Sequence, residues 1–114
     1  MADKEASRKL EAGKAFDAAG LVDYAEGSIV SRTIFDADAG TLTLFAFDAG
    51  QSLSEHQTPF DAIVHVLDGE AELVIGGTVA ATAAGQIVVM PASVPHAVRA
   101  RRRFKMLLTM VRSR

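Results

Sequence analysis

Short apolar runs alternate with turn signals along most of the chain. From Ser28 onward the runs are rich in β-branched and aromatic residues, and breaks containing Gly, Asp or Pro separate them about every ten residues. This spacing is typical of an antiparallel all-β sandwich or barrel. The runs that predict strands span residues 28–35, 41–48, 61–67, 70–75, 78–83, 86–90, 96–100 and 104–111.

Two of the breaks predict tight turns. Gly76 and Gly77 in "IGGT" favour a two-residue hairpin, because glycine tolerates the positive φ that such a turn requires. Asp68 and Gly69 in "LDGE" are expected to form the centre of another tight turn.

The run "TLTLFAFD", residues 41–48, is apolar on both of its alternating faces. A strand of this kind is normally covered on both sides. We therefore expect a core on one side and a neighbouring element or subunit on the other, and we predict a homodimer.

The N-terminal region has a different texture. Residues 3–19 are rich in Ala, Lys and Glu, which favours a short helix, although Gly13 interrupts it and Leu10 and Phe16 are its only large apolar anchors. The predicted organisation is therefore an arm with a short helix over residues 1–27 and a barrel over residues 28–114.

Composition limits the class of protein further. A chain of 114 residues with 49% hydrophobic residues is long enough for one domain with a packed core. The absence of cysteine excludes disulfides, thiolate zinc sites and a cysteine nucleophile. The first twenty residues contain no apolar core of a signal peptide, and no apolar run is long enough to cross a bilayer. These features predict a cytoplasmic protein that does not enter membranes.

Charge is distributed unevenly, although the net charge is only -2. All acidic residues lie at or before Glu72, and the run "RARRRFK" at residues 99–105 is strongly basic. A nucleic-acid site needs a larger basic surface with stacking aromatic residues. We therefore expect no nucleic-acid partner and expect the arginines to pair with acids of the first half.

Two stretches share a distinctive spacing of Gly, His and Pro. The first places Gly50, His56 and Gly69 at fixed intervals, and the second places Gly85, Pro91 and His96 in the same way. This frame resembles the two motifs of the cupin superfamily, and "VLDGEAELVIGG" followed by "GQIVVMPASVPH" resembles its small single-domain bacterial members. The resemblance covers about residues 30–111. It implies an antiparallel jelly-roll barrel with a central pocket.

The resemblance implies a metal site in which, as in metal-binding cupins, three His and one Glu hold iron, manganese, nickel or zinc. Here His56 and His96 match two His positions, whereas Thr58 replaces the second His and Ala62 replaces the Glu. Ser93 stands at the Gly of the second motif. Catalytic metals are usually held by at least three protein ligands. His56 and His96 are thus candidate ligands of a reduced metal site, or pocket histidines that bind a ligand by hydrogen bonds.

Neighbouring carboxylates do not restore the missing ligands. Strand alternation turns Glu55 away from the face that His56 uses, and Asp61 lies one residue from the Glu position. The replacement by Ala62 also adds space. Strand parity predicts an apolar wall around the two histidines, with Thr58 beside it; this wall consists of Phe60, Ala62, Met90, Phe104, Met106, Leu108 and Met110.

Three functions follow from these residues. The first is a small-molecule-binding cupin with a remodelled pocket around His56 and His96 and an unknown ligand. The second is a metal-dependent cupin enzyme, oxygenase-like or isomerase-like, that uses these two His with Zn, Ni, Mn or Fe. The third is a structural or regulatory dimer with a vestigial pocket. No catalytic nucleophile is indicated, because no Ser lies in a Gly-x-Ser-x-Gly pattern.

Overall fold

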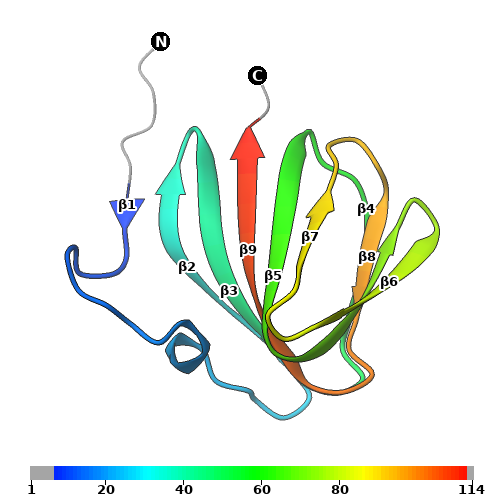
Figure 1. Cartoon of the computed structure of the whole chain (residues 1–114), viewed down its shortest axis with the longest axis horizontal. Helices are drawn as coiled ribbons and strands as arrows, with labels where there is room; N and C mark the ends of the chain where they lie inside the picture. Colours follow the sequence, from blue (N-terminus) through cyan, green and yellow to red (C-terminus); the bar gives the residue numbers. More distant parts are fainter. Residues whose placement is uncertain (1–6, 113–114) are drawn as a thin grey trace.

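The structure, a computed structural model, describes residues 7–112. Nine antiparallel strands and one short 3-10 helix follow one another along the described chain (Figure 1). Their bounds are β1 Ser7–Arg8, η1 Ala18–Leu21, β2 Ile29–Ala37, β3 Gly40–Phe47, β4 Ser52–His56, β5 Phe60–Ile75, β6 Thr78–Ala83, β7 Ile87–Met90, β8 His96–Arg99 and β9 Phe104–Arg112. The predicted all-β fold is confirmed. This part of the chain holds no helix with the length and apolarity to span a membrane.

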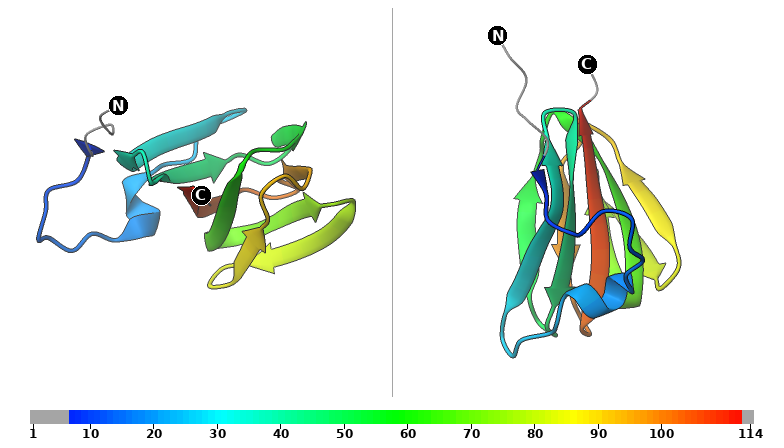
Figure 2. Two further views of the ribbon diagram at one scale, coloured as in Figure 1. Left: turned by 90° about the horizontal axis from the view of Figure 1, so that it is seen from above. Right: turned by 90° about the vertical axis from the view of Figure 1, so that its left-hand side faces the viewer.

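The strands connect into one sheet that curls into a half-barrel (Figure 2). Its order is β1-β2-β3-β9-β5-β8-β4, and β6 and β7 also pair with β5. The sixteen-residue strand β5 belongs to both parts of the curled sheet, because its first part pairs with β7 and β9 and its last part pairs with β6 and β8. The sequence runs between Ser28 and Val111 therefore become strands of one continuous sheet.

The core takes alternating side chains from the strands of this sheet. Phe47 and Phe104 are fully buried and stack with ring centroids 4.6 Å apart. Complete burial of a side chain of this size contributes about 1.5–3 kcal/mol. The other buried members of the cluster are Ala62, Val64, Val66, Ala71, Leu73, Met90, Val98, Ala100 and Met106.

One of the two predicted turns is confirmed and the other is wrong. Gly76 and Gly77 have φ angles of +57° and +85° and close the hairpin between β5 and β6. Asp68 and Gly69 instead lie inside β5, at a bulge opposite β9. Gly69 has a φ of +73°, and a Cβ there would lie 2.3 Å from the carbonyl oxygen of Arg103. The glycine is thus required for a bend in a continuous strand rather than for a chain reversal.

The predicted N-terminal helix is wrong in the described part of residues 3–19, while residues 1–6 lie outside it. Ser7 and Arg8 pair with β2, and the backbone N–H of Lys9 donates to the carbonyl of Ile34 at 3.0 Å. The helical turn described here, η1, comes later and is only four residues long. Gly13 has a φ of +80°, which breaks a right-handed helix. Pairing with the edge of β2 has overridden the local helix propensity.

The N-terminal segment covers the second apolar face of β3. Leu44 and Ala46 are fully buried and pack with Val22, and Leu21 and Tyr24 pack against the same cluster. The right-hand view of Figure 2 shows this segment lying across the sheet. The doubly apolar strand is therefore explained within one chain, and the homodimer stays a prediction.

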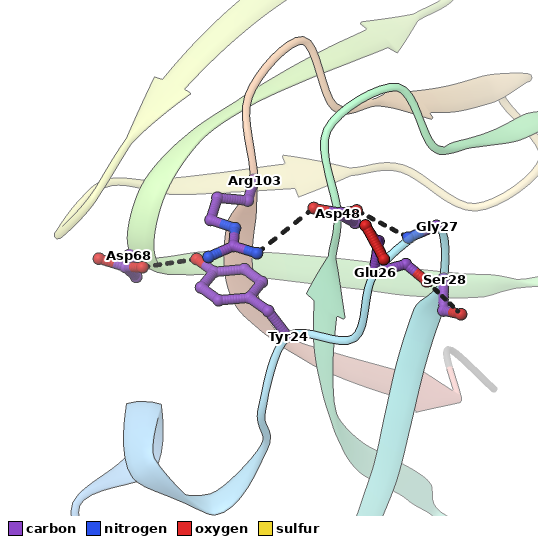
Figure 3. Close-up of polar contacts among 7 residues, drawn as sticks. All are labelled: Tyr24, Glu26, Gly27, Ser28, Asp48, Asp68 and Arg103. Carbon is purple, nitrogen blue, oxygen red and sulfur yellow. Dashed lines mark hydrogen bonds and ion pairs between the residues drawn. The ribbon is translucent and has the colours of Figure 1, made fainter.

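A polar cluster fastens this segment to the barrel (Figure 3). The Tyr24 hydroxyl donates to Asp68 at 2.5 Å, and the Arg103 guanidinium lies 4.3 Å from the Tyr24 ring centroid. Burial, followed by the hydrogen bond to Asp68, raises the pKa of Tyr24. Arg103 also pairs with Asp48 at 3.5 Å, and Asp48 accepts the N–H of Gly27 at 2.7 Å. The Gly27 hydrogen bond is the main cause that lowers the pKa of Asp48.

Two other arginines of the basic run, Arg99 and Arg101, meet an acid on β5. Glu72 accepts from Nε of Arg101 at 3.1 Å and lies 3.8 Å from Nη1 of Arg99. The expected pairing of late arginines with early acids is confirmed within one chain. Because both arginines are largely exposed, each pair contributes at most about 1 kcal/mol.

Candidate functional site

His56 and His96 lie directly opposite each other on adjacent strands. His56 ends β4 and His96 begins β8, and the two residues are register partners. Their ring centroids are 4.4 Å apart, with the ring planes at 69°. His56 is exposed, whereas His96 is only 5% exposed. The fold thus brings together the two histidines that the sequence selected from positions forty residues apart.

Each imidazole is held by a backbone carbonyl two residues earlier. Nδ1 of His56 lies 2.9 Å from the carbonyl oxygen of Ser54, and Nδ1 of His96 lies 3.3 Å from that of Val94. A carbonyl oxygen only accepts, so Nδ1 of each ring must be the donor. In the neutral form both Nε2 atoms are then lone-pair acceptors. Carbonyl partners orient metal-binding and ligand-binding histidines in the same way.

Nε2 of His96 remains accessible. Within the described residues, no side-chain nitrogen or oxygen is both buried and without a hydrogen-bond partner. Because His96 bonds through Nδ1, the small exposed fraction of the residue must include Nε2. Burial, followed by the charge of a protonated His56, lowers the pKa of His96. His96 is therefore neutral at pH 7 and presents a free acceptor.

Thr58 is committed to its own turn. Its hydroxyl donates to the carbonyl of Phe60 at 3.1 Å and accepts the N–H of Phe60 at 3.2 Å. Its carbonyl accepts the N–H of Ser93 at 2.8 Å, which joins the loop after β4 to the loop before β8. Asp61, near the start of β5, also binds the loop before β8, because its Oδ1 accepts the N–H of Ala92 at 2.8 Å. Thr58 and Asp61 thus shape the site through backbone contacts.

Ala62 lies in an apolar row across three strands. It is 2% exposed and pairs with Met90 of β7 and Met110 of β9. Of the remaining wall residues predicted from sequence, Phe104 and Met106 are sealed in the core, whereas Phe60, Leu108 and Met110 are half-buried.

Two cavities lie apart from the histidine pair. The smaller has a volume of about 250 Å³ and the larger about 440 Å³. The smaller is lined by Asp36, Ala37, Asp38, Gly40, Thr41, Phe60, Met110 and Arg112. The larger is lined by Glu70, Ala71, Glu72, Val79, Ala81, Arg101 and Arg102.

Neither cavity includes His56 or His96, but the smaller one brings together Phe60 and Met110, two of the predicted wall residues. Sequence reasoning missed the acidic side of this cavity. Asp36 and Asp38 belong to "DADAG", one of the breaks that separate the apolar runs, and such a break predicts a turn but no cavity. The pairing register of β2 with β3 places Asp36 opposite Thr41. A prediction of this register would have located the two aspartates at the cavity.

The donor set falls short of a complete metal site. No group of three or more His, Asp or Glu side chains within residues 7–112 is placed to hold a metal ion. Two imidazoles with free Nε2 atoms are suitable ligands for a transition metal, but a catalytic centre generally needs a third protein ligand. Ala62, enclosed by methionines, cannot supply it. The residues present do not fit a tightly held metal, and we assign no chemical step to one.

Residues 43–111 match the cupin domain family. The match spans more than half of the chain, and the protein therefore belongs to this family. The resemblance of its two Gly–His motifs to cupins is confirmed. No curated protein matches the chain.

Solved structures support the same assignment. A conserved protein of unknown function from Streptococcus pyogenes is 36% identical, with a TM-score of 0.88 and 94% of each chain covered. A cupin superfamily protein from Desulfitobacterium hafniense is 26% identical, with a TM-score of 0.85 over 91% of this chain and 95% of that one. A DMSP lyase from Ruegeria pomeroyi is 26% identical, with a TM-score of 0.66 over 73% of this chain and 46% of that one.

Proposed function

We propose that this cupin binds a small molecule through Nε2 of His56 and Nε2 of His96. The observation that supports this proposal is the pair of Nδ1 contacts to backbone carbonyls, at 2.9 and 3.3 Å, on rings 4.4 Å apart. These contacts fix the same tautomer in both rings. Two acceptors are thereby presented side by side, and no described side chain bonds to either one.

The acceptors define the polar end of the ligand. A hydroxyl, an amide N–H or a protonated acid donates to a neutral imidazole, whereas a carboxylate has no proton to donate. Few polar groups and many apolar neighbours are typical of small-molecule sites. Ile75 and Leu53, which pair with His96 and with Val98 on β8, are partly buried against the apolar core. The proposed ligand is a small, largely apolar molecule with one hydrogen-bond-donating end.

A fragment screen by ligand-observed NMR tests this proposal. The library should compare alcohols, primary amides and carboxylates of equal size. We expect alcohols or amides to bind wild-type protein and to lose binding in His56→Ala and in His96→Ala. His65→Ala is the matched control, because His65 lies at an outward position of β5, between the core residues Val64 and Val66.

Two results would reject the proposal. One is that every binder is retained by both site variants. The other is that His56→Ala fails to fold, because an exposed histidine that only binds a ligand should contribute little to stability.

A metal-dependent enzyme is the second candidate. The carbonyl contacts leave both Nε2 atoms available as ligands, and a DMSP lyase is among the solved structures to which this chain is similar. Elemental analysis of untagged protein purified without chelator tests it, with His96→Ala as the control. Near-stoichiometric Zn, Ni, Mn or Fe that is lost in the variant would support the enzyme. Absence of metal after soaking with Zn, Ni, Mn and Fe would exclude the metal-dependent enzyme and leave the metal-free ligand site as the proposal.

We further propose that the protein acts in the cytoplasm as a homodimer. A cysteine-free chain has no need of an oxidising compartment. A structural or regulatory dimer with a vestigial pocket is the outcome if no small molecule binds.

A further inference from the structure

The larger cavity lies where β5, β6 and the loop after β8 meet. Its volume of about 440 Å³ is within the range of about 300–1,000 Å³ that small-molecule sites occupy. Neither histidine of the opposed pair lines this cavity, so it is separate from the ligand site proposed above. Its wall carries four charged side chains, those of Glu70, Glu72, Arg101 and Arg102.

Strand register gives the cavity an apolar floor. Ala81 of β6 is opposite Glu72 of β5, and Val79 lies two residues before Ala81, so these side chains share one face of the sheet. Leu73, which follows Glu72, is in the core, and Ala80 packs against it, so the shared face is the outer one. Val79 is 55% exposed, and no described strand pairs with β6 on its other side (Figure 1). An aliphatic group of a ligand can therefore rest on this floor.

Glu72 holds one arginine at the edge of the cavity. Nε of Arg101 donates to Oε1 of Glu72 at 3.1 Å, and Nη1 of Arg99 lies 3.8 Å from Oε2 of the same carboxylate. A guanidinium is a planar fork of several N–H donors, so the Nη groups of Arg101 can still bind an acceptor. Because two arginines share one carboxylate, this edge keeps a positive charge. Together with Arg102 it suits a carboxylate, which arginine binds with paired N–H groups.

Glu70 and Arg102 carry opposite charges in the same cavity but do not pair. Within residues 7–112, neither side chain forms an ion pair or a hydrogen bond. Glu70 is opposite Ala83 of β6 and two residues before Glu72, so it also points to the outer face. A ligand that carries both an anionic and a cationic group can pair with both side chains.

We propose that this cavity binds a zwitterionic amino acid with an aliphatic side chain. The carboxylate of the ligand accepts hydrogen bonds from Arg101 and Arg102, and its ammonium group donates to Glu70. Its aliphatic chain lies on Val79 and Ala81. Glu70 repels a ligand that is only anionic, and the arginines repel one that is only cationic. Because the charged groups are largely exposed, each ion pair contributes little, and we expect a dissociation constant of about 1 mM.

An NMR titration of isotope-labelled protein with L-leucine at pH 7 tests the proposal. The amide resonances of Val79 and Ala81 should shift, while those of His56 and His96 should not. Two analogues of similar size test the charges of the ligand: leucinamide lacks the carboxylate, and isocaproate lacks the ammonium group. Each analogue should bind about 5-fold more weakly than leucine, which corresponds to the loss of one exposed ion pair.

Variants of the protein test the same contacts from the other side. Glu70→Gln and Arg102→Gln, made separately, should each weaken leucine binding by about 5-fold. Both residues are exposed, so both variants should fold. Glu55→Gln and Lys14→Gln are the matched controls. They remove exposed charges far from the cavity lining and should bind leucine as the wild-type protein does.

Four results would overturn the proposal. The first is no shift of the Val79 and Ala81 resonances at leucine concentrations well above the expected dissociation constant. The second is that isocaproate or leucinamide binds as tightly as leucine. The third is unchanged leucine binding in both cavity variants. The fourth is loss of leucine binding in His56→Ala, which would assign leucine to the histidine pair. None of the first three affects the fragment screen on the histidine variants, so the two sites are tested separately.

Discussion

Ser93 offers a sharp test of how the site loop is built. Its φ is +64°, and it is the one non-glycine residue with a positive φ among residues 7–112. The cupin motif has glycine at this position. A Cβ in the left-handed region costs about 1–2 kcal/mol. Ser93→Gly should relieve this strain while keeping the backbone N–H that donates to Thr58 at 2.8 Å.

The gain is smaller than the strain, because glycine also makes the unfolded chain more flexible. That entropy offsets about 0.5–1 kcal/mol. We therefore expect Ser93→Gly to raise the free energy of unfolding by about 0.5–1 kcal/mol. An unfolding entropy of about 2.1 cal/mol/K per residue gives about 0.24 kcal/mol/K for the 114 residues. The melting temperature should rise by about 2–4 °C.

Thermal unfolding followed by circular dichroism measures this change. Ser93→Ala is the matched control, because it removes the hydroxyl but keeps the Cβ, and it should give no comparable gain. A Ser93→Gly variant that is less stable than wild type would refute the reasoning. So would an equal gain in Ser93→Ala, which would assign the effect to the hydroxyl.

Three further predictions concern stability and the site. Tyr24→Phe removes the hydrogen bond to Asp68 and should lower the free energy of unfolding by about 1 kcal/mol in urea titrations. An unchanged urea midpoint would argue against a stabilising role of this hydrogen bond. Because the pKa of His96 is lowered in the folded protein, the unfolded chain binds a proton more readily at this residue, and stability should fall as pH decreases below about 6.5. His96→Gln should reduce this pH dependence in thermal unfolding between pH 5 and 8. The double variant Thr58→His and Ala62→Glu should be less stable than wild type by several kcal/mol when it is metal-free, because its new carboxylate is buried. Added zinc should restore the stability of this variant. An equal stabilisation of the wild-type protein by zinc would contradict the ligand count.

The sequence predicted the barrel because its motif glycines are backbone requirements. Gly50, Gly69 and Gly85 have φ angles of +87°, +73° and +90°. Other residues rarely adopt these angles, so glycine spacing marks the bends of the fold. The apolar runs between them were sufficient to locate eight stretches of strand.

Elements without an apolar pattern were harder to predict. β4, with the sequence "SLSEH", is largely exposed and was not among the predicted strands. The break at Asp68 and Gly69 was interpreted as a turn because a bulge uses the same residues as a hairpin. Whether the chain reverses there depends on pairing with β9, which lies more than thirty residues later.

The site could be predicted only in part. Motif spacing selected His56 and His96, and the fold places them in contact. The protonated nitrogen of each ring depends on the carbonyls of Ser54 and Val94, which sequence cannot position. Strand parity likewise assigned Phe104 to the pocket wall, although the stack with Phe47 seals it in the core.

The most direct test of the central claim is the ring-nitrogen NMR spectrum of the three histidines at pH 7.5, recorded before and after addition of a fragment that binds. The account predicts that His56 and His96 are protonated at Nδ1 and that their Nε2 resonances both shift on binding, while those of His65 do not. Protonation at Nε2, or a bound fragment that leaves both Nε2 resonances in place, would contradict it.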